Sequence, residues 1–185
     1  MLIDITLRIT PEMIKGAPSN ENRSLLGHIG THFDVMEGEF PLEYTRRAGI
    51  IFDVSQVMGR DIDIGDIPLE HVRRDMFVAF YTGYIETEPS GTKIYFAEHP
   101  QLSERLIHAL LEKGVSIIGL DCAGIRRGAE HVPMDRLCAE HETFVVENLW
   151  NLKTVLATGA RFTAHTYPMR CADITGLPCR VVAEV

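Results

Sequence analysis

The alternation of apolar and polar side chains predicts the first strand of the protein. Residues 1–9 alternate between aliphatic and polar side chains, with Asp4 between Ile3 and Ile5, which is the period of a half-buried strand. Three later segments are rich in aliphatic and aromatic residues and are bounded by Gly, Ser or Asp: 49–55, 76–83 and 115–121. Their composition predicts buried strands, so we expect a sheet within the fold.

Two segments have the features of helices. Apolar residues recur at helical intervals from Leu102 to Lys113, with Ser103 near the start and Gly114 as a C-cap. A second helix, from Asp135 to about His141, is expected to lead into a strand at residues 143–146. The combination predicts an α/β fold with a mixed sheet. Because the chain lacks a Gly-x-Gly-x-x-Gly fingerprint, a nucleotide-binding Rossmann site is not expected.

Other segments are assigned from turn chemistry and local alternation. Residues 11–23 are expected to be irregular, and 122–133 to form a loop. Residues 61–68 alternate acid and isoleucine, which favours an edge strand with a solvated acidic face over a calcium loop. Near the C-terminus, strands at 161–167 and 180–185 are expected on either side of a turn through Gly176, Leu177 and Pro178.

The composition is that of one soluble domain. With 185 residues, of which 45% are hydrophobic, the chain can bury a core, and we expect a single domain spanning residues 1–185. A net charge of −8 argues against binding to nucleic acids or anionic membranes. No apolar run approaches ~18 residues and no secretion signal is present, so we expect a cytoplasmic protein. The four cysteines lack CxxC spacing and are expected to be thiols.

The candidate chemistry begins at residues 27–34, which hold His28, His32 and Asp34. On an extended strand the two histidines would lie ~13 Å apart, at ~3.3 Å per residue, and could not share one ion. A turn at Gly30, whose missing Cβ permits unusual dihedral angles, would bring all three side chains to one divalent cation. The alternative is that the histidines are ordinary core or surface residues and Asp34 forms a turn.

The motif His28-Ile-Gly-Thr-His32-Phe-Asp34 resembles the His-x-Gly-Thr-His-x-Asp signature of the metal-dependent cyclase family, which includes bacterial kynurenine formamidases and isatin hydrolases. The resemblance implies a swivelling β/β/α fold and a homodimer or homotetramer. In that family the motif continues as Asp-Ala-Pro-x-His, whose last histidine transfers protons, whereas Gly38 stands there in this chain. Glu37 or Glu39 would be a surrogate base if burial raised its pKa; otherwise either is an exposed loop charge.

A second segment carries the rest of the resemblance. Glu147-Asn-Leu, followed by Asn151-Leu152, is similar to a family segment in which a metal-binding histidine precedes the glutamate by twelve residues. Asp135 occupies that position here. The resemblance therefore implies a set of metal ligands: His28, His32, Asp34, Asp135 and Glu147. His131 and His141 are alternatives. Two imidazoles and three carboxylates favour Zn²⁺ or Mn²⁺, with Mg²⁺ as a further option, and one ion held by the first three residues is another arrangement.

These residues lead to a hypothesis about the reaction. A divalent ion with an open coordination position acidifies water and polarises a carbonyl. The resemblance thus implies a metal-dependent amidohydrolase, similar to arylformamidases, acting on a small amide, formamide, lactam or lactone. Because Gly38 replaces the proton-transfer histidine, two alternatives stay open: a relative that uses the metal in a lyase or isomerase reaction, and a binding protein whose metal is structural.

Overall fold

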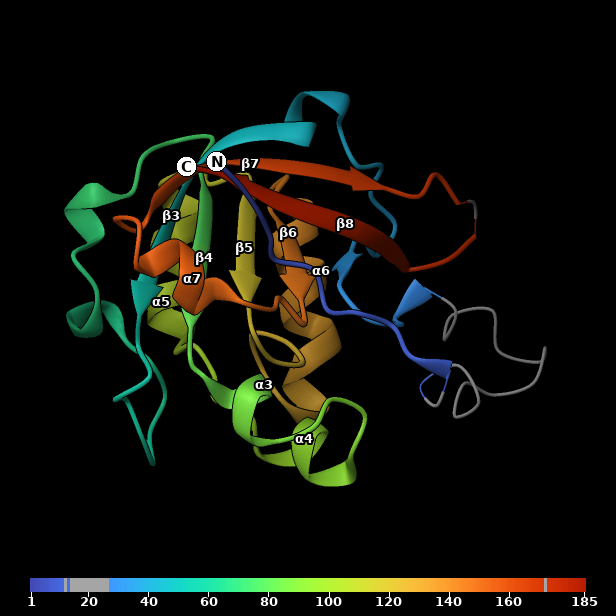
Figure 1. Ribbon diagram of the computed structural model, residues 1–185, viewed down its shortest axis with the longest axis horizontal. Helices are drawn as coiled ribbons and strands as arrows, with labels where there is room; N and C mark the ends of the chain where they lie inside the picture. The colour runs from blue at the N-terminus through green and yellow to red at the C-terminus, as the bar shows by residue number, and fades with distance from the viewer. Residues whose placement is uncertain (12, 14–26, 172) are drawn as a thin grey trace.

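A closed, mixed β-sheet organises the fold (Figure 1). The computed structural model describes residues 1–11, 13, 27–171 and 173–185. Within them the strands are β1 (Leu2–Asp4), β2 (His32–Asp34), β3 (Arg46–Asp53), β4 (Phe77–Tyr81), β5 (Ile117–Leu120), β6 (Phe144–Glu147), β7 (Arg161–Pro168) and β8 (Gly176–Glu184).

The strand order explains how the sheet closes. The order is β1-β8-β2-β6-β5-β4-β3-β7, and β7 also pairs with β8. Strands β3 to β6 are parallel neighbours, whereas β2 and β7 are antiparallel to the strands beside them. One edge of β8 pairs with β2 near Gly176 and with β1 near Glu184. Seven strands of the described chain thus form a barrel-like sheet, and β1 is an addition to β8.

Helices and short turns connect the strands. They are η1 (Leu42–Thr45), η2 (Ile64–Asp66), η3 (Leu69–His71), α3 (Tyr84–Thr87), α4 (Lys93–Glu98), α5 (Glu104–Glu112), η4 (Gly128–Glu130), α6 (His131–Glu140) and α7 (Leu152–Leu156). The helix predicted at 102–113 is confirmed. It begins after Ser103, whose hydroxyl accepts a hydrogen bond from the Leu106 amide, and ends before Gly114, which has a positive φ of 66°.

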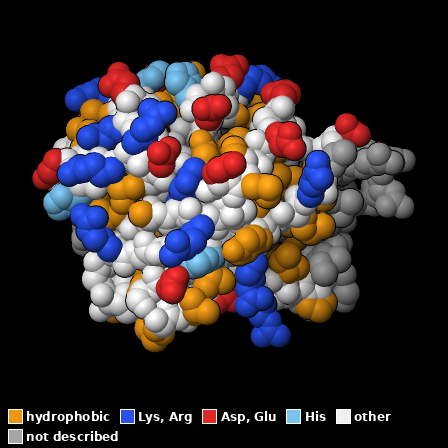
Figure 2. All heavy atoms as spheres, turned by 90° about the horizontal axis from the view of Figure 1, so that it is seen from above, with side chains coloured by type: hydrophobic (Ala, Val, Ile, Leu, Met, Phe, Trp, Pro, Cys, Tyr) orange, Lys and Arg blue, Asp and Glu red, His pale blue; other side chains and the backbone are white. Residues whose placement is uncertain are grey.

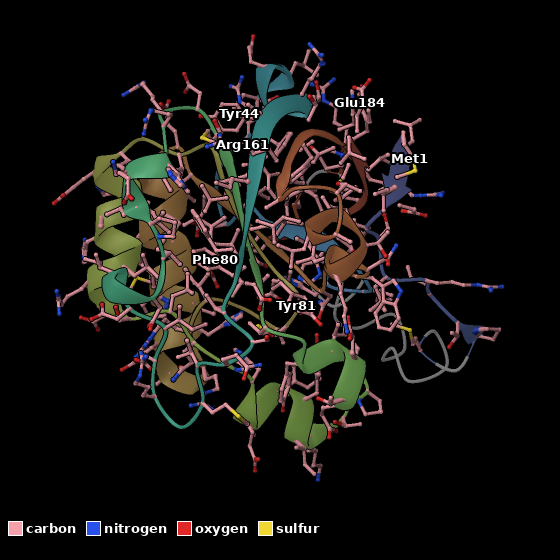
Figure 3. All side chains as sticks on the ribbon, turned by 60° about the vertical axis from the view of Figure 1, so that its left-hand side comes forward. Met1, Tyr44, Phe80, Tyr81, Arg161 and Glu184 are labelled. Atoms are coloured by element: carbon pink, nitrogen blue, oxygen red, sulfur yellow. The ribbon has the colours of Figure 1, made fainter. Side chains whose placement is uncertain are left out.

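Side-chain alternation along the parallel strands creates two apolar cores, because successive residues of a strand point to opposite faces. Phe80 packs with residues of α5 in one core, and its neighbour Tyr81 belongs to the other, inside the barrel-like sheet. Figure 3 shows the two side chains on opposite sides of β4. The parallel strands are buried on both faces, as expected for strands of continuous apolar sequence.

Three predictions of local structure were wrong. Residues 61–68 do not form an edge strand: Asp63 and Asp66 hydrogen-bond each other's backbone and close the short helix η2, because Asp side chains compete for backbone amides. Helix α6 begins at His131 rather than Asp135, since Pro133 in a first turn removes no intrahelical hydrogen bond. Residues 176–178 are not a turn but the start of β8, paired with β2.

The segment 11–23, which the sequence predicted to be irregular, lies mostly outside the described residues.

The surface carries charges of both signs. Figure 2 shows acidic and basic side chains interspersed over one face, with apolar side chains between them. Exposed ion pairs such as Arg180–Asp4, at 2.7 Å, are formed, and such pairs contribute little to stability. Among the described residues, every helix is too short or too polar to cross a membrane.

Candidate metal centre

A turn at Gly30 brings His28 beside the start of β2. Gly30 has a φ of 68°, which confirms the predicted turn at this residue. His32 and Asp34 lie two residues apart on β2 and therefore share one face of the strand. The Nδ1 atom of His28 lies 3.0 Å from Nε2 of His32 and 3.1 Å from Oδ1 of Asp34. The three side chains thus converge, although an extended chain would have kept the histidines apart.

Hydrogen bonds to Asn148 hold this turn. The Thr31 hydroxyl donates to the Asn148 carbonyl at 2.7 Å and accepts from the Leu7 amide at 2.8 Å. The Asn148 side-chain amide donates to the Gly30 carbonyl at 3.1 Å. Asn148 follows Glu147 directly, so the same contacts that fix the turn also fix the end of β6.

Strand pairing and helix α6 supply the remaining side chains. His32 on β2 is directly opposite Glu147 on β6, and its Nε2 lies 3.4 Å from Oε2 of Glu147. On α6, His131 and Asp135 are one turn apart and share a helix face. The His131 Nε2 atom lies 3.4 Å from Oδ2 of Asp135 and 3.7 Å from Oε1 of Glu147. Segments far apart in the sequence therefore meet at one cluster.

The imidazoles are oriented by hydrogen bonds on their outer sides. His32 Nδ1 donates to the Gly30 carbonyl at 2.9 Å, and His131 Nδ1 donates to the Arg126 carbonyl at 3.1 Å. A carbonyl can only accept, so in the neutral rings the proton sits on Nδ1 and the Nε2 lone pair faces the carboxylates. His28 Nε2 lies 3.1 Å from the Thr175 hydroxyl, and its Nδ1 faces the cluster. Such outer contacts are typical of histidines that bind metals.

The carboxylates of the cluster lack hydrogen-bond partners. Both oxygens of Asp34, both of Asp135 and Oε1 of Glu147 are buried, and none accepts a hydrogen bond from the described residues. Buried polar groups are normally paired, because an unpaired one loses its hydration without compensation. Lone pairs of imidazole nitrogens facing unpaired carboxylate oxygens repel one another unless a cation lies between them.

The pKa values reflect this accumulation of charge. Burial raises the pKa of Asp135 and of Glu147 well above the ordinary range, and the nearby Asp34 charge adds to both shifts. Burial acts in the same direction on Asp34, but the imidazoles of His28 and His32 outweigh it and lower the pKa of Asp34. Burial lowers the pKa of His32. Three carboxylates cannot all ionise here without a compensating positive charge.

These residues fit a divalent cation. Two groups offer ligand atoms that all lie within 4.8 Å of one another: His28, His32 and Asp34, and Asp34, His131 and Asp135. Asp34 belongs to both groups, and Glu147 lies beside each of them. Nitrogen and oxygen donors of this kind suit Zn²⁺, Mn²⁺ and Mg²⁺ rather than soft metals.

A glycine makes room for the cluster. Gly124 has a φ of 113°, and a Cβ there would lie 2.6 Å from His131 Nδ1 and 2.8 Å from Glu147 Oε1. Such distances are too short for real side chains, so only glycine allows the backbone to approach both groups.

Some of the site residues predicted from the sequence lie together in the cluster, and others lie away from it. It brings together the five residues predicted as ligands: His28, His32, Asp34, Asp135 and Glu147. It also adds His131, which the sequence analysis treated only as an alternative; the i, i+4 spacing to Asp135 was the available signal. His141 is exposed, and its Nδ1 donates to the carbonyl of Leu137.

The glutamates predicted as surrogate bases lie elsewhere. The Glu37 side chain is 72% exposed and faces Arg136 at 3.4 Å, and that of Glu39 is 89% exposed and lies 3.9 Å from Arg170. The burial that was the condition for either residue is therefore not found in the chain described here. This corrects the expectation of a surrogate base, because the loop turns both carboxylates into solvent.

A cleft adjoins the cluster on the side of His28. Its volume is about 1090 Å³, and it lies between the segment after β2 and the connection from β7 to β8. Apolar side chains such as Met36, Phe40 and Leu177 line much of it. Thr175, whose hydroxyl contacts His28, is part of its wall. Thr175 thus links the wall of the cleft to His28, which does not itself line the cleft.

The fold and the cluster together define the class of protein: a single-sheet α/β protein with a candidate divalent-metal centre. The family model for Cyclase, described as "Putative cyclase", matches residues 3–126, or 124 of the 185 residues. The chain belongs to this family. The matched residues include His28, His32 and Asp34, and they end before α6 and Glu147.

Solved structures share the fold over nearly their whole length. A potential metal-dependent hydrolase with cyclase activity has 22% identity and a TM-score of 0.76, covering 99% of this chain and 96% of that chain. An isatin hydrolase bound to the product analogue thioisatinate has 20% identity and a TM-score of 0.75, with 100% and 92% covered. Isatin hydrolase A from Ralstonia solanacearum has 15% identity and a TM-score of 0.77, with 99% and 91% covered. A comparison with curated proteins found no match. The predicted swivelling β/β/α fold is thereby confirmed.

Proposed function

We propose that this protein is a metal-dependent hydrolase of a small amide, formamide, lactam or lactone. One observation supports it most: five buried carboxylate oxygens without partners surround the inward-facing nitrogens of His28, His32 and His131. A bound cation would satisfy all of these groups together. Membership of the Cyclase family and the fold shared with isatin hydrolases support a hydrolytic reaction.

The residues of the cluster have separable tasks in this proposal. His28, His32 and Asp34 would hold the cation on the side of the cleft, and His131, Asp135 and Glu147 would complete the site. A bound divalent cation acts as a Lewis acid toward a carbonyl and makes water more acidic. The outer hydrogen bonds of His32 and His131 keep their rings in one tautomer. The largely apolar cleft beside His28 would hold the body of a small, partly aromatic substrate.

The position expected to hold the proton-transfer histidine carries a glycine. Gly38 stands where the resembling enzymes carry a histidine, and a Cβ at Gly38 would lie 3.0 Å from the Val35 carbonyl and 3.1 Å from the Phe144 ring. General acid–base help is worth about 10²–10⁴-fold in rate. We therefore expect slow hydrolysis. The same observation favours a second candidate function, a metal-binding family member that does not hydrolyse its ligand.

Metal analysis and turnover measurements test both candidates. Purified protein would be stripped with a chelator, reloaded separately with Zn²⁺, Mn²⁺ or Mg²⁺, and assayed for bound metal and for hydrolysis of isatin, N-formylkynurenine and a lactone panel. His32→Ala should lose metal and turnover together. His165→Ala is the matched control, because His165 pairs with Glu184 on β8 and not with the cluster.

Each result supports or contradicts one of the two candidate functions. Bound metal with turnover that disappears in His32→Ala supports the hydrolase. Bound metal without turnover of any substrate class favours the non-hydrolytic relative. A wild-type protein that folds normally but retains none of the three metals contradicts both.

A further inference from the structure

Arg126 carries a buried guanidinium group just outside the candidate metal centre. The residue is 8% exposed. Its Nη1 atom donates to Oδ2 of Asp61 at 2.6 Å and to the Leu102 carbonyl at 2.7 Å. Its Nε atom donates to Oε2 of Glu130 at 2.9 Å, and Nη2 donates to the same oxygen. One side chain thus connects the segment 125–127 to three separate parts of the chain.

Backbone contacts fix the same segment on both sides of Arg126. The Leu102 amide donates to the Ile125 carbonyl at 3.0 Å. On the other side, the Arg127 amide donates to Oε1 of Gln101 at 2.8 Å. The carbonyl of Arg126 is therefore held in one direction, and it accepts the hydrogen bond from Nδ1 of His131.

We propose that Arg126 is a positioning residue for His131. Its side chain holds the segment 125–127 so that its own carbonyl keeps the proton of His131 on Nδ1 and directs Nε2 toward Asp135 and Glu147. This inference rests on the proposed function, because it requires a cation that His131 binds. Outer partners of metal-binding histidines set the tautomer and orientation of the ring in this way.

A purely stabilising role explains the arrangement less well. Burying a guanidinium costs solvation, and its two carboxylate partners, Asp61 and Glu130, are 39% and 53% exposed, so solvent weakens the stability these pairs provide. What an apolar residue cannot supply is a fork that reaches Asp61, Leu102 and Glu130 at once. The network therefore specifies a geometry, and the group whose geometry depends on it is His131.

A double-mutant cycle on the full chain tests this proposal, with Zn²⁺ alone as the probe. The dissociation constant for Zn²⁺ would be measured by calorimetric or competitive titration in wild type, Arg126→Met, His131→Ala and the double variant. We expect Arg126→Met to weaken binding by about 10–100-fold in the wild-type background, and by less than twofold when His131 is already Ala. Arg180→Met, which removes the exposed pair with Asp4, should leave binding unchanged.

A second readout and a second set of variants keep the test decisive. In the Co²⁺-loaded protein, Arg126→Met should change the visible absorption bands as His131→Ala does. If Arg126→Met fails to fold, Glu130→Ala and Asp61→Ala each remove one partner of the guanidinium, and the loss of affinity they cause should also vanish in the His131→Ala background.

The outcomes separate this inference from the proposed function. Equal losses of affinity in both backgrounds, or a His131→Ala variant that binds Zn²⁺ like wild type, overturn the role of Arg126 while leaving a centre built on His28, His32 and Asp34. A wild-type protein that binds no Zn²⁺ overturns the proposed function and this inference together.

Discussion

Replacing Asp135 by Asn should stabilise the metal-free protein and reduce the extra stability that bound metal provides. Both carboxylate oxygens of Asp135 are buried without a partner, and Oδ2 faces the lone pair of His131 Nε2 at 3.4 Å. Burial raises the pKa of Asp135, so the folded chain gives up this carboxyl proton at a higher pH than the unfolded chain does. A raised pKa means that stability is lost as the pH rises above the ordinary value. The amide of Asn removes this penalty and could donate to His131.

The expected change in folding stability follows from the burial of the Asp135 side chain, which is 0% exposed. An unsatisfied buried polar group costs about 1–3 kcal/mol, and more when it is charged. For a chain of this length, about 1 kcal/mol shifts Tm by about 2–4 °C. We therefore expect Asp135→Asn to raise the Tm of the metal-free protein by about 4–8 °C for a gain of about 2 kcal/mol. A cation at a hundredfold excess over Kd adds about 2.7 kcal/mol to wild type, and the variant should lose most of that gain.

Thermal denaturation in chelator and in excess Zn²⁺ at pH 8 measures both parts of this prediction. Asp121→Asn is the control, because Asp121 is also a buried carboxylate but accepts hydrogen bonds from Thr82 and Gly83 at 2.6–2.8 Å. It should destabilise the protein equally with and without metal. If Asp135→Asn lowers the metal-free Tm as much as Asp121→Asn does, the unpaired carboxylate is not a cost and the reasoning fails.

Three further predictions concern the turn, the ligands and acid stability. Gly30→Ala places a Cβ 2.8 Å from Ile9 Cγ1 at a positive φ, so it should cost about 1–3 kcal/mol in urea denaturation; an unchanged midpoint would contradict the need for glycine. His32→Ala should reduce bound Zn²⁺ to background by elemental analysis, and full retention would remove His32 from the ligand set. Burial lowers the pKa of His99 from 6.5 to about 4, so folding stability should fall by about 3 kcal/mol as pH decreases from 6.5 to 4 (about 2.5 units at about 1.36 kcal/mol each). A His99→Gln variant that keeps the same acid sensitivity would refute this.

The amino-acid sequence by itself determined the main strands and the first half of the candidate site. Continuous apolar runs predict strands buried on both faces, because each face meets a core of its own. The strands at β3, β4 and β5 were therefore predicted from composition. The spacing of His28, His32 and Asp34 around Gly30 predicted a turn, since only a bend brings side chains four residues apart on a strand to one point.

Pairing between distant segments was decided only by the tertiary structure. Whether residues 176–178 form a turn or a strand depends on β2, which lies more than 140 residues earlier and supplies the partner carbonyls and amides. Likewise, local sequence does not show that Glu147 stands opposite His32, because the register of two strands is set by the packing of both.

The same holds for the second half of the site. His131 reaches the cluster because α6 begins one turn earlier than its composition indicated, and because the Arg126 carbonyl, held by contacts to residues 61, 102 and 130, orients its ring. Conversely, Glu37 and Glu39 follow the motif directly but point into solvent. Nearness in sequence constrains side chains only over a turn or two, whereas the contents of a buried site depend on which distant surfaces pack together.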